Sequence, residues 1–409
     1  MVDPAGVDTP GIAASRRGST RAEVVLGVDF GTSYTSAGAM IDGRVDLVRD
    51  NGDAVIPSVV YVPARGEPVV GARALAHALH DPQHTVCSVK RLLGERHDAA
   101  GLRRLAPLVP YPLVAGIGGR VHLRLHQTDW AAEQIAAAVL GHVRELAERR
   151  FGPVRKVVLA VAAEATLEQR QALLTAARLA RLEVIDLVPE PVAGALALGL
   201  HARPERRRVV VCDFGGGTFD VTLVEQTGTR FHVVATGGDP FLGGDDLDQA
   251  MAQALSGLVF RRSGFDVTHD LVRRTLLARR CEGAKRVLST QLEARLTMRD
   301  AFVERGERRD LDVVLERSWC EALWEPLFDR ALAVVDQTVA RSGWRDQPID
   351  EVGLIGGTSL VPRFQQRLRA RFAGSRLNLS EDAHVAVATG AALVAARHGA
   401  VTLTHASAC

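Results

Sequence analysis

Two short stretches of the chain share one pattern of apolar, acidic and glycine positions. Residues 209–212 form an apolar run, which predicts a buried strand, and Asp213 ends this run. Three glycines, 215–217, follow as a turn, and residues 219–223 then alternate apolar and polar side chains with the period of a strand. The stretch predicts two strands joined by a glycine turn, with a carboxylate where the first strand ends.

The second stretch stands near the N-terminus. The apolar run 24–28 leads into Asp29, Phe30 and Gly31, and hydroxyl-bearing residues at 32–34 precede another alternation. The separation between the two stretches is too long for a short repeat array. We expect two similar halves of one protein, each of which presents a carboxylate and a glycine turn to a shared ligand.

Glycine turns of this kind bind anions, because glycine permits positive φ and consecutive free N–H groups form a concave nest. A carboxylate beside such a turn repels phosphate unless a divalent cation lies between them. The two stretches together favour a nucleotide bound with Mg²⁺. For either stretch alone, a glycine hairpin with an aspartate cap is the plain alternative.

Longer patterns fill the rest of the chain. Thr128 or Asp129 is expected to cap a long helix that starts at Trp130, and Thr166 to begin another. Further helices are expected at 246–262, 270–290, 318–341 and 386–396, and further strands at 156–161, 184–188, 231–236, 292–297, 311–315 and 351–355. Strands and helices alternate in two halves, 24–203 and 204–382, which indicates an α/β protein.

Polar residues at the ends and on the faces of these elements are candidates for chemistry. Glu190 stands between two prolines at a strand–helix junction, where a rigid carboxylate can orient a water molecule or interact with the helix dipole. One helix face carries four polar residues, Glu282, Lys285, Arg286 and Ser289. That face suits either an adenosine or a solvated row of salt bridges. The glycines at 356 and 357 follow a strand and precede a helix, which is typical of an anion or ribose site.

The bulk composition excludes several function classes. Hydrophobic residues make up 47% of the 409 residues and the net charge is +2, which suits a globular protein and gives no reason to expect nucleic-acid binding. No apolar run reaches the roughly 18 residues that span a membrane. Residues 1–22 lack an apolar core, so we expect a disordered arm and no secretory signal. The five cysteines are scattered without a CxxC motif, which favours reduced thiols in the cytoplasm.

Particular residues argue against other kinds of site. No lysine follows a glycine, so there is no P-loop, and the glycines at 215–217 turn into a strand, which argues against a dinucleotide fold. Histidines at 77, 80 and 84 raise the question of a metal site. Pro82 breaks their helix before His84, and only Cys87 adds a further ligand type, so we predict no metal site there.

Six stretches, in this order, resemble the DnaK-type heat shock protein 70 family, within the actin-like ATPases. They are residues 27–34 (GVDFGTSY), 89–94 (VKRLLG), 188–194 (VPEPVAG), 213–220 (DFGGGTFD), 281–289 (CEGAKRVLS) and 352–358 (VGLIGGT). The similarity covers residues 24–398. The KRLLG element and the spacing E-x-x-K-R-x-x-S separate this family from sugar kinases and actins.

The resemblance implies an α/β, two-lobed actin-like ATPase fold (ribonuclease H-like) with a nucleotide cleft between the lobes. Lobe I is expected at 24–203, with residues 383–398 returning to it, and lobe II at 204–382. A short tail is expected at 399–409.

The resemblance also implies roles for the residues around the phosphates. Asp29 and Asp213 would hold Mg²⁺ through water, Lys90 would neutralise the γ-phosphate, and Glu190 would orient the attacking water with Asp220 nearby. The phosphates would lie between two turns, formed by Gly31, Thr32, Ser33 and Tyr34 on one side and by Gly215, Gly216, Gly217 and Thr218 on the other. The implied catalytic set is Lys90, Glu190, Asp213, Thr218 and Asp220.

The adenosine of ATP or ADP would be held by the polar helix face. Glu282, Lys285, Arg286 and Ser289 would lie opposite Gly356, Gly357 and Thr358. Three places depart from the family pattern. Ala162 replaces a proline associated with signalling between the nucleotide and substrate domains. Leu360 replaces an arginine that packs at the adenine, and His384-Val385 replace an Asp-Glu pair.

The sequence ends at Cys409, so we expect the linker and the peptide-binding β-domain of the family to be absent from this chain. We expect a slow, Mg²⁺-dependent, stand-alone ATPase that acts as a chaperone-like nucleotide switch on a protein partner or client, with no membrane or nucleic-acid partner. Two alternatives stay open. One is a non-hydrolysing nucleotide-binding scaffold or regulator, and the other is a small-molecule kinase or filament-forming relative of the same fold.

Overall fold

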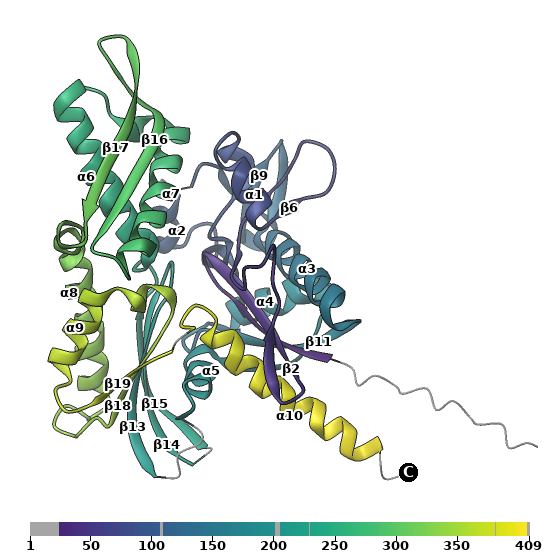
Figure 1. Cartoon of the computed structure of the whole chain (residues 1–409). Helices are drawn as coiled ribbons and strands as arrows, with labels where there is room; N and C mark the ends of the chain where they lie inside the picture. Colours follow the sequence, from purple (N-terminus) through teal and green to yellow (C-terminus); the bar gives the residue numbers. More distant parts are fainter. Residues whose placement is uncertain (1–23, 107–108, 201–204, 229, 381, 407–409) are drawn as a thin grey trace, which may run out of the picture.

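The computed structural model describes residues 24–106, 109–200, 205–228, 230–380 and 382–406. The arm expected at 1–22 lies outside these residues. Figure 1 shows two bodies side by side, one with β1, β2, β11, α3 and α4 and the other with β13–β15, β18 and α6–α9. In the described part of the chain, no helix is both long and apolar enough to cross a membrane.

The first body is built on a mixed sheet of six strands in the order β12-β11-β1-β2-β3, with β4 beside β2. Its strands are β1 (Val24–Phe30), β2 (Tyr34–Ile41), β3 (Arg44–Leu47), β4 (Ile56–Pro57), β11 (Val154–Val161) and β12 (Glu183–Pro189). The first three strands form an antiparallel meander, and β11 and β12 continue the sheet in parallel with β1.

The second body repeats this order in its five-stranded sheet, β15-β14-β13-β18-β19. The strands are β13 (Arg206–Phe214), β14 (Phe219–Thr227), β15 (Arg230–Asp239), β18 (Glu351–Ile355) and β19 (Arg376–Leu379). Again an antiparallel meander comes first and two parallel strands follow. Asp29 and Asp213 each occupy the penultimate position of the first strand, so the expectation of two similar halves is confirmed.

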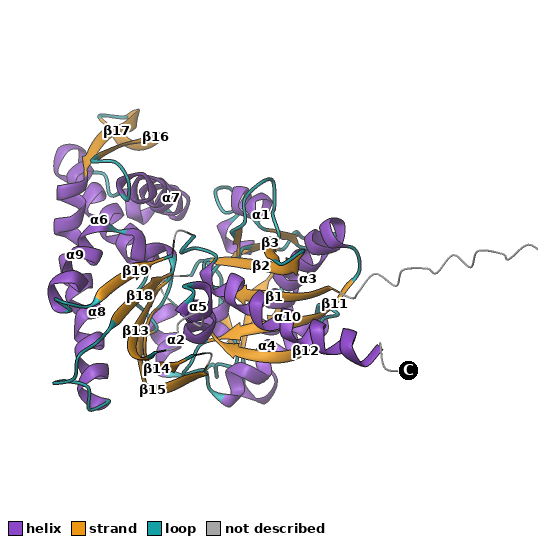
Figure 2. Cartoon of the chain, turned by 60° about the horizontal axis from the view of Figure 1, so that its bottom comes forward, coloured by secondary structure: helices purple, strands orange, loops and turns teal. Residues whose placement is uncertain are grey.

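The main strands are apolar because both faces of each sheet are covered. In β11, Val157, Leu159 and Val161 belong to one buried cluster, and Val158 and Ala160 to another on the opposite face. The helices α3 (Ala132–Phe151) and α4 (Leu167–Leu179) contribute to the first cluster, and α5 (Glu190–Ala197) and α10 (Ala386–Ala406) to the second. A sheet with two covered faces yields continuous apolar strands instead of alternating ones. Figure 2 shows the helices on either side of the sheets.

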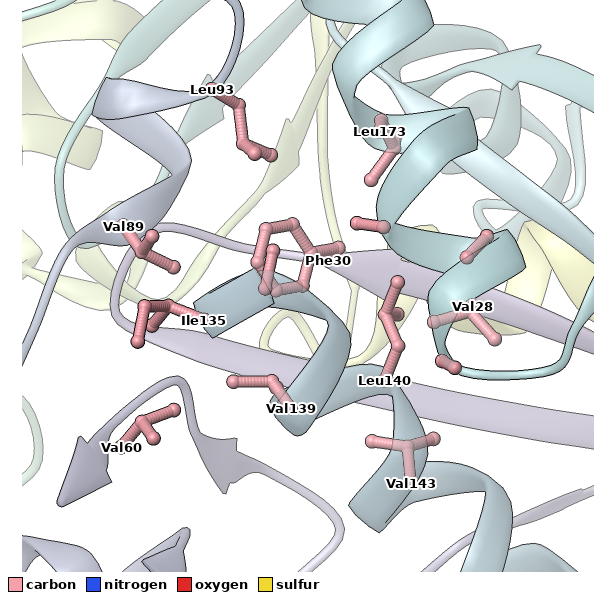
Figure 3. Packing of buried hydrophobic residues seen from close by; sticks show 14 of the residues in the cluster. Val28, Phe30, Val60, Val89, Leu93, Ile135, Val139, Leu140, Val143 and Leu173 are labelled. Carbon is pink, nitrogen blue, oxygen red and sulfur yellow. The ribbon is translucent and has the colours of Figure 1, made fainter. Parts of the chain in front are cut away.

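Figure 3 shows the first cluster, where Val28 and Phe30 of β1 meet Ile135, Val139 and Leu140 of α3. Phe30 has no exposed surface. Burying a side chain of this size stabilises the fold by about 1.5–3 kcal/mol. The residue that follows Asp29 thus anchors the end of β1 and fixes the position of the carboxylate.

Helices and a hairpin complete the second body. They are α6 (Gly244–Ser263), α7 (Leu271–Leu288), the hairpin β16 (Glu293–Glu304) and β17 (Glu307–Glu316), α8 (Arg317–Arg341) and α9 (Pro362–Arg371). The strands predicted at 292–297 and 311–315 are confirmed, and they pair with each other. Figure 1 shows this hairpin beside α6 and α7, at the end of the body far from β13–β15.

Short elements fill the upper part of the first body. They are β5 (Val60–Tyr61), β6 (Val69–Val70), α1 (Ala72–His77), η1 (Pro82–His84), β7 (Thr85–Val86), η2 (Val89–Leu92), α2 (Ala100–Leu105), β8 (Leu113–Ala115), β9 (Val121–Leu125) and β10 (Thr128–Ala131).

The predicted start of the long helix at Trp130, capped by Thr128 or Asp129, is wrong. Residues 128–131 form β10, whose backbone pairs with β9, and α3 begins at Ala132. Gln134 caps this helix by accepting a hydrogen bond from the backbone N–H of Ala131 at 2.9 Å. The backbone of residues 128–131 pairs with β9 in the hairpin and is therefore not available to start the helix.

The last helix closes the first body from below. We predicted that it ends at 396 and that a tail follows from 399, whereas α10 continues to Ala406. It lies tightly against the fold, since a Cβ at Gly27 would lie 2.0 Å from the backbone of Ala392, and a Cβ at Gly390 would lie 1.8 Å from Ala193. Both glycines are required because backbone meets backbone there.

Candidate functional site

A cleft of about 530 Å³ lies between the two bodies, where the two glycine turns meet. Every predicted site residue except Asp220 lines it: Asp29, Gly31, Thr32, Ser33, Tyr34, Lys90, Glu190, Asp213, Gly215, Gly216, Gly217, Thr218, Glu282, Lys285, Arg286, Ser289, Gly356, Gly357 and Thr358. Residues that lie far apart along the chain are thus gathered around a single space.

The two glycine turns approach each other too closely for larger side chains. A Cβ at Gly216 would lie 2.3 Å from Ser33 Oγ, and a Cβ at Gly217 would lie 2.6 Å from Thr32 Cγ2. The guanidinium of Arg91 donates to the carbonyl oxygen of Gly217, which ties η2 of the first body to the turn of the second. These glycines therefore let the two turns approach each other across the cleft, and they also leave room for a ligand.

Four carboxyl groups lie around one ammonium group where the cleft meets a neighbouring cavity: Asp29, Glu190 and Asp213 line the cleft, and Asp220 lines the cavity. Lys90 Nζ donates to Glu190 Oε1 at 2.8 Å. Burial, and then repulsion from Glu190, raises the pKa of both Asp29 and Asp220 to about 7. The same causes raise the pKa of Asp213 well above its ordinary value. This excess of buried negative charge favours a bound cation.

Lys90 keeps its charge in this setting. Burial by itself lowers the pKa of Lys90, but the attraction of Glu190 and Asp29 outweighs burial, and the pKa of Lys90 is raised. Glu190 is the first residue of α5 and is buried. Its position at the end of β12 matches the predicted strand–helix junction.

Asp220 lies on the other side of this group. It lines a neighbouring cavity of about 470 Å³ together with Ala162 and Glu164, and this cavity shares Lys90 and Glu190 with the cleft. Asp220 is therefore near the predicted site but faces a separate space. The structure places the departure at position 162 in the same cavity.

The polar face of α7 forms one wall of the cleft. The hydroxyl of Tyr34 donates to Glu282, and the guanidinium of Arg286 lies 5.4 Å from the centroid of the Tyr34 ring. Burial raises the pKa of Glu282, but the bond from Tyr34 and the charges of Arg279 and its neighbours outweigh this, so the pKa is lowered. Tyr34 thus contacts the α7 face, although the resemblance placed it at the phosphates.

Lys285 is engaged inside the second body. Its Nζ donates to the carbonyl oxygen of Gly244 and to Asp248 Oδ2, both at 2.7 Å, and only 9% of the residue is exposed. It holds the first turn of α6 against α7 while its surface still lines the cleft. Its main contacts are therefore structural.

The opposite wall is the turn after β18. Gly356 has a φ of 79°, and a Cβ there would lie 2.5 Å from Asp213 Oδ1. Thr358 Oγ1 donates to the carbonyl oxygen of Gly215 at 2.8 Å. Leu360 and His384, two of the three departures, also line this wall, and burial lowers the pKa of His384.

Sequence reasoning missed three residues of the site. Asp245 accepts a hydrogen bond from Ser33 Oγ at 3.2 Å across the cleft, and its N–H donates to the carbonyl oxygen of Gly216 at 2.8 Å. Gly244 N donates to the carbonyl oxygen of Gly215 at 3.0 Å. Arg91 also crosses between the bodies. The sequence Gly-Gly-Asp-Asp at 243–246 was a local signal for the first two residues, but it does not indicate their partners.

Two sheets of identical strand order, closed around a polar cleft between glycine turns, define the two-lobed actin-like ATPase fold, as the resemblance implied. The family model described as "Hsp70 protein" matches residues 25–403, and the chain belongs to this family. The heat shock 70 kDa protein BIP3 of Oryza sativa subsp. japonica is 36% identical over 379 residues. The match covers 91% of this chain and 56% of that relative, so the chain spans little more than half of the relative's length.

Proposed function

We propose that this chain binds Mg²⁺–ATP in the cleft, hydrolyses it slowly and acts as a nucleotide switch whose lobe positions bias a protein partner. The observation that carries the proposal is the set of four carboxyl groups around a single lysine, near two glycine turns; Glu190 is buried and the three aspartates are partly buried. The turns suit phosphate, and the carboxyl groups suit a cation that accompanies it.

The residues fit a hydrated Mg²⁺ ion. Mg²⁺ prefers oxygen ligands and retains several of its waters. Among the described residues, the cleft carboxyl groups do not converge as a set of three that could hold an ion directly. Asp29 and Asp213 would therefore hold the ion through water, and the ion would neutralise phosphate oxygens when bound.

Lys90 and Glu190 would have separate roles in the hydrolysis. The ammonium group of Lys90, which stays charged, would offset the charge that develops on the terminal phosphate. Glu190, fixed at the start of α5 and bonded to Lys90 through Oε1, would orient a water molecule for attack. The turns at 31–34 and 215–218 would fix the phosphates, since correct orientation accounts for much of phosphoryl-transfer catalysis.

The α7 face and the turn at 356–358 would hold the adenosine between them. Glu282 and Arg286 present polar groups from α7, and Leu360 presents an apolar surface from the opposite wall. We propose a cytoplasmic location for the protein, supported by four free cysteines among the described residues.

One observation favours a second candidate, a nucleotide-binding scaffold that does not hydrolyse ATP. Lys90 and Glu190 bind each other directly, so each already uses part of its hydrogen-bonding capacity before nucleotide binds. If the pair persisted with nucleotide bound, the protein would report nucleotide occupancy without turnover.

Single-turnover hydrolysis of ATP with Mg²⁺ tests the proposal, with wild type compared with Lys90→Ala. The matched control is Arg308→Ala, which removes one positive charge from the exposed end of the β16–β17 hairpin. We expect hydrolysis in wild type and control and none in Lys90→Ala, with binding retained. Binding without hydrolysis in all three proteins would support the scaffold, and absence of binding would refute both functions.

A further inference from the structure

A cluster of metal-binding side chains lies in the first lobe, apart from the cleft. Among the residues that the structure describes, Asp81, His84 and His126 form a group whose ligand atoms lie within 4.8 Å of one another. Asp81 and His84 come from η1 and the residue before it, and His126 comes from the turn between β9 and β10. All three are partly exposed, so an ion could reach them from solvent.

One nitrogen of each ring is placed to act as a ligand. His84 Nδ1 lies 2.7 Å from Asp81 Oδ1, so an ion could replace the proton that joins these two atoms. His126 Nε2 lies 3.0 Å from the carbonyl oxygen of Val62, which only accepts, so Nδ1 keeps its lone pair. Histidines that bind metals commonly donate their other N–H to a carboxylate or a carbonyl in this manner.

The two rings are stacked face to face. The centroids of His84 and His126 are 3.5 Å apart, and the ring planes differ by 9°. The hydroxyl of Tyr61 donates to the carboxylate of Asp81 and orients it. An imidazole nitrogen binds an ion in the plane of its ring, so one ring would have to turn out of the stack to share an ion with the other. Ligand atoms around a tetrahedral ion lie roughly 3.4 Å apart at ordinary metal–nitrogen distances, so the groups, now within 4.8 Å, would close by about 1.4 Å at most.

The backbone at His126 positions the third ligand. His126 and Gln127 have φ values of 47° and 63° and form the two-residue loop of a hairpin in which Leu125 pairs with Thr128. Two positive φ values define a type I′ turn, which strongly favours Asn-Gly. Histidine also tolerates positive φ, and this turn places its imidazole against His84.

We propose that Asp81, His84 and His126 bind a divalent transition-metal ion of the Zn²⁺ type. Imidazole nitrogens with one carboxylate select such ions over Mg²⁺ and Ca²⁺, which prefer oxygen ligands throughout. The sequence argument against a metal site weighed the histidines at 77, 80 and 84 together with Cys87. The third ligand instead comes from a hairpin turn that the sequence did not reveal.

The ion would join two separate parts of the first lobe. The segment η1 contacts α7 of the second lobe, and Pro82 and Thr85 line a cavity between the lobes together with Arg274 and Thr275 of α7. A metal would fasten η1, which lies a few residues before Lys90 in the chain, to the β9–β10 turn. It would stiffen the face of lobe I that meets α7, independently of nucleotide.

The test is a calorimetric titration of the full chain with ZnCl₂ after chelator treatment, without nucleotide. The key variant is His126→Asn, because asparagine suits the type I′ turn and should preserve the fold. His84→Asn is the second variant, and His269→Asn, at an exposed histidine of the other lobe, is the matched control.

We expect wild type and His269→Asn to bind one Zn²⁺, and both cluster variants to bind at least about 30-fold more weakly, in line with the loss of a ligand. Zn²⁺ should also raise the melting temperature of wild type but not of His126→Asn, whereas Mg²⁺ alone should leave it unchanged. Equal Zn²⁺ affinity in wild type and in both cluster variants would overturn the proposal. Failure of wild type to bind an equivalent of Zn²⁺ would overturn it as well.

Discussion

Binding of Mg²⁺–nucleotide should release protons, and the amount should fall steeply as the pH rises. The pKa of Asp29 is raised to about 7 by burial first and by Glu190 second. In the ligand-free protein this carboxyl group is therefore about 90% protonated at pH 6, about half protonated at pH 7 and less than about 10% protonated at pH 8.5. A cation held beside Asp29 requires the ionised form, so binding must expel the proton.

The same shift predicts how stability depends on pH. The folded-state pKa of Asp29 lies above its ordinary value of 3.8. Between pH 4 and pH 7, the folded protein therefore holds a proton on Asp29 that the unfolded chain has already released. The stabilisation is complete below pH 4 and is lost as the pH rises through 7, an effect on the order of 4 kcal/mol at most. The ligand-free protein should lose stability over this range, and Mg²⁺–nucleotide should restore it.

The assay is titration calorimetry with Mg²⁺–ADP in buffers of different ionisation enthalpy, at pH 6, 7 and 8.5. The matched variant is Asp29→Asn, which keeps the shape and an oxygen but cannot bind a proton in this range. Subtracting the variant from wild type isolates Asp29, and the difference should fall from about 0.9 proton at pH 6 to about 0.5 at pH 7 and below about 0.1 at pH 8.5. A difference of zero at pH 6, with binding intact, would refute the inference that cation and proton compete for this carboxylate.

Three substitutions test the packing around the site. Gly216→Ala places a Cβ 2.3 Å from the serine hydroxyl of the opposite turn, and should weaken nucleotide binding more than 10-fold in a fluorescence titration. Gly215→Ala, whose Cβ meets nothing closer than 3.6 Å, serves as its control, and equal affinities would contradict the close approach of the turns. Gly27→Ala puts a Cβ 2.0 Å from α10 and should lower the melting temperature by several degrees, about 1–3 kcal/mol, whereas Gly141→Ala, in open space on α3, should raise it slightly. Lys285→Met leaves the buried aspartate of α6 without its counterion and should cost about 3–5 kcal/mol in urea unfolding, and a loss below about 1 kcal/mol would contradict a buried ion pair.

Local patterns were sufficient to predict the scaffold and most of the cleft. A strand that ends in an aspartate before glycines is encoded within a few residues, so Asp29 and Asp213 could be placed at matching positions of two sheets. The helix face at 282–289 was predictable because residues three and four apart must lie together.

The remainder depended on contacts between distant parts of the chain. Asp245 and Arg91 act through partners in the other lobe, and nothing in their neighbours indicates those partners. The hairpin at His126 escaped prediction because its turn lacks the asparagine and glycine by which such turns are recognised. Its second strand was consequently read as the start of α3.

The position of α10 constrains how the protein can fold as it is synthesised. The helix supplies part of the cover for the first sheet, and its glycine and alanine backbone fits directly against β1 and α5. Strand β1 and helix α5 leave the ribosome long before α10 does, although domains ordinarily fold in the order of their synthesis. Part of one apolar face of the first sheet, the part that α5 does not cover, therefore stays open while the whole second lobe is made.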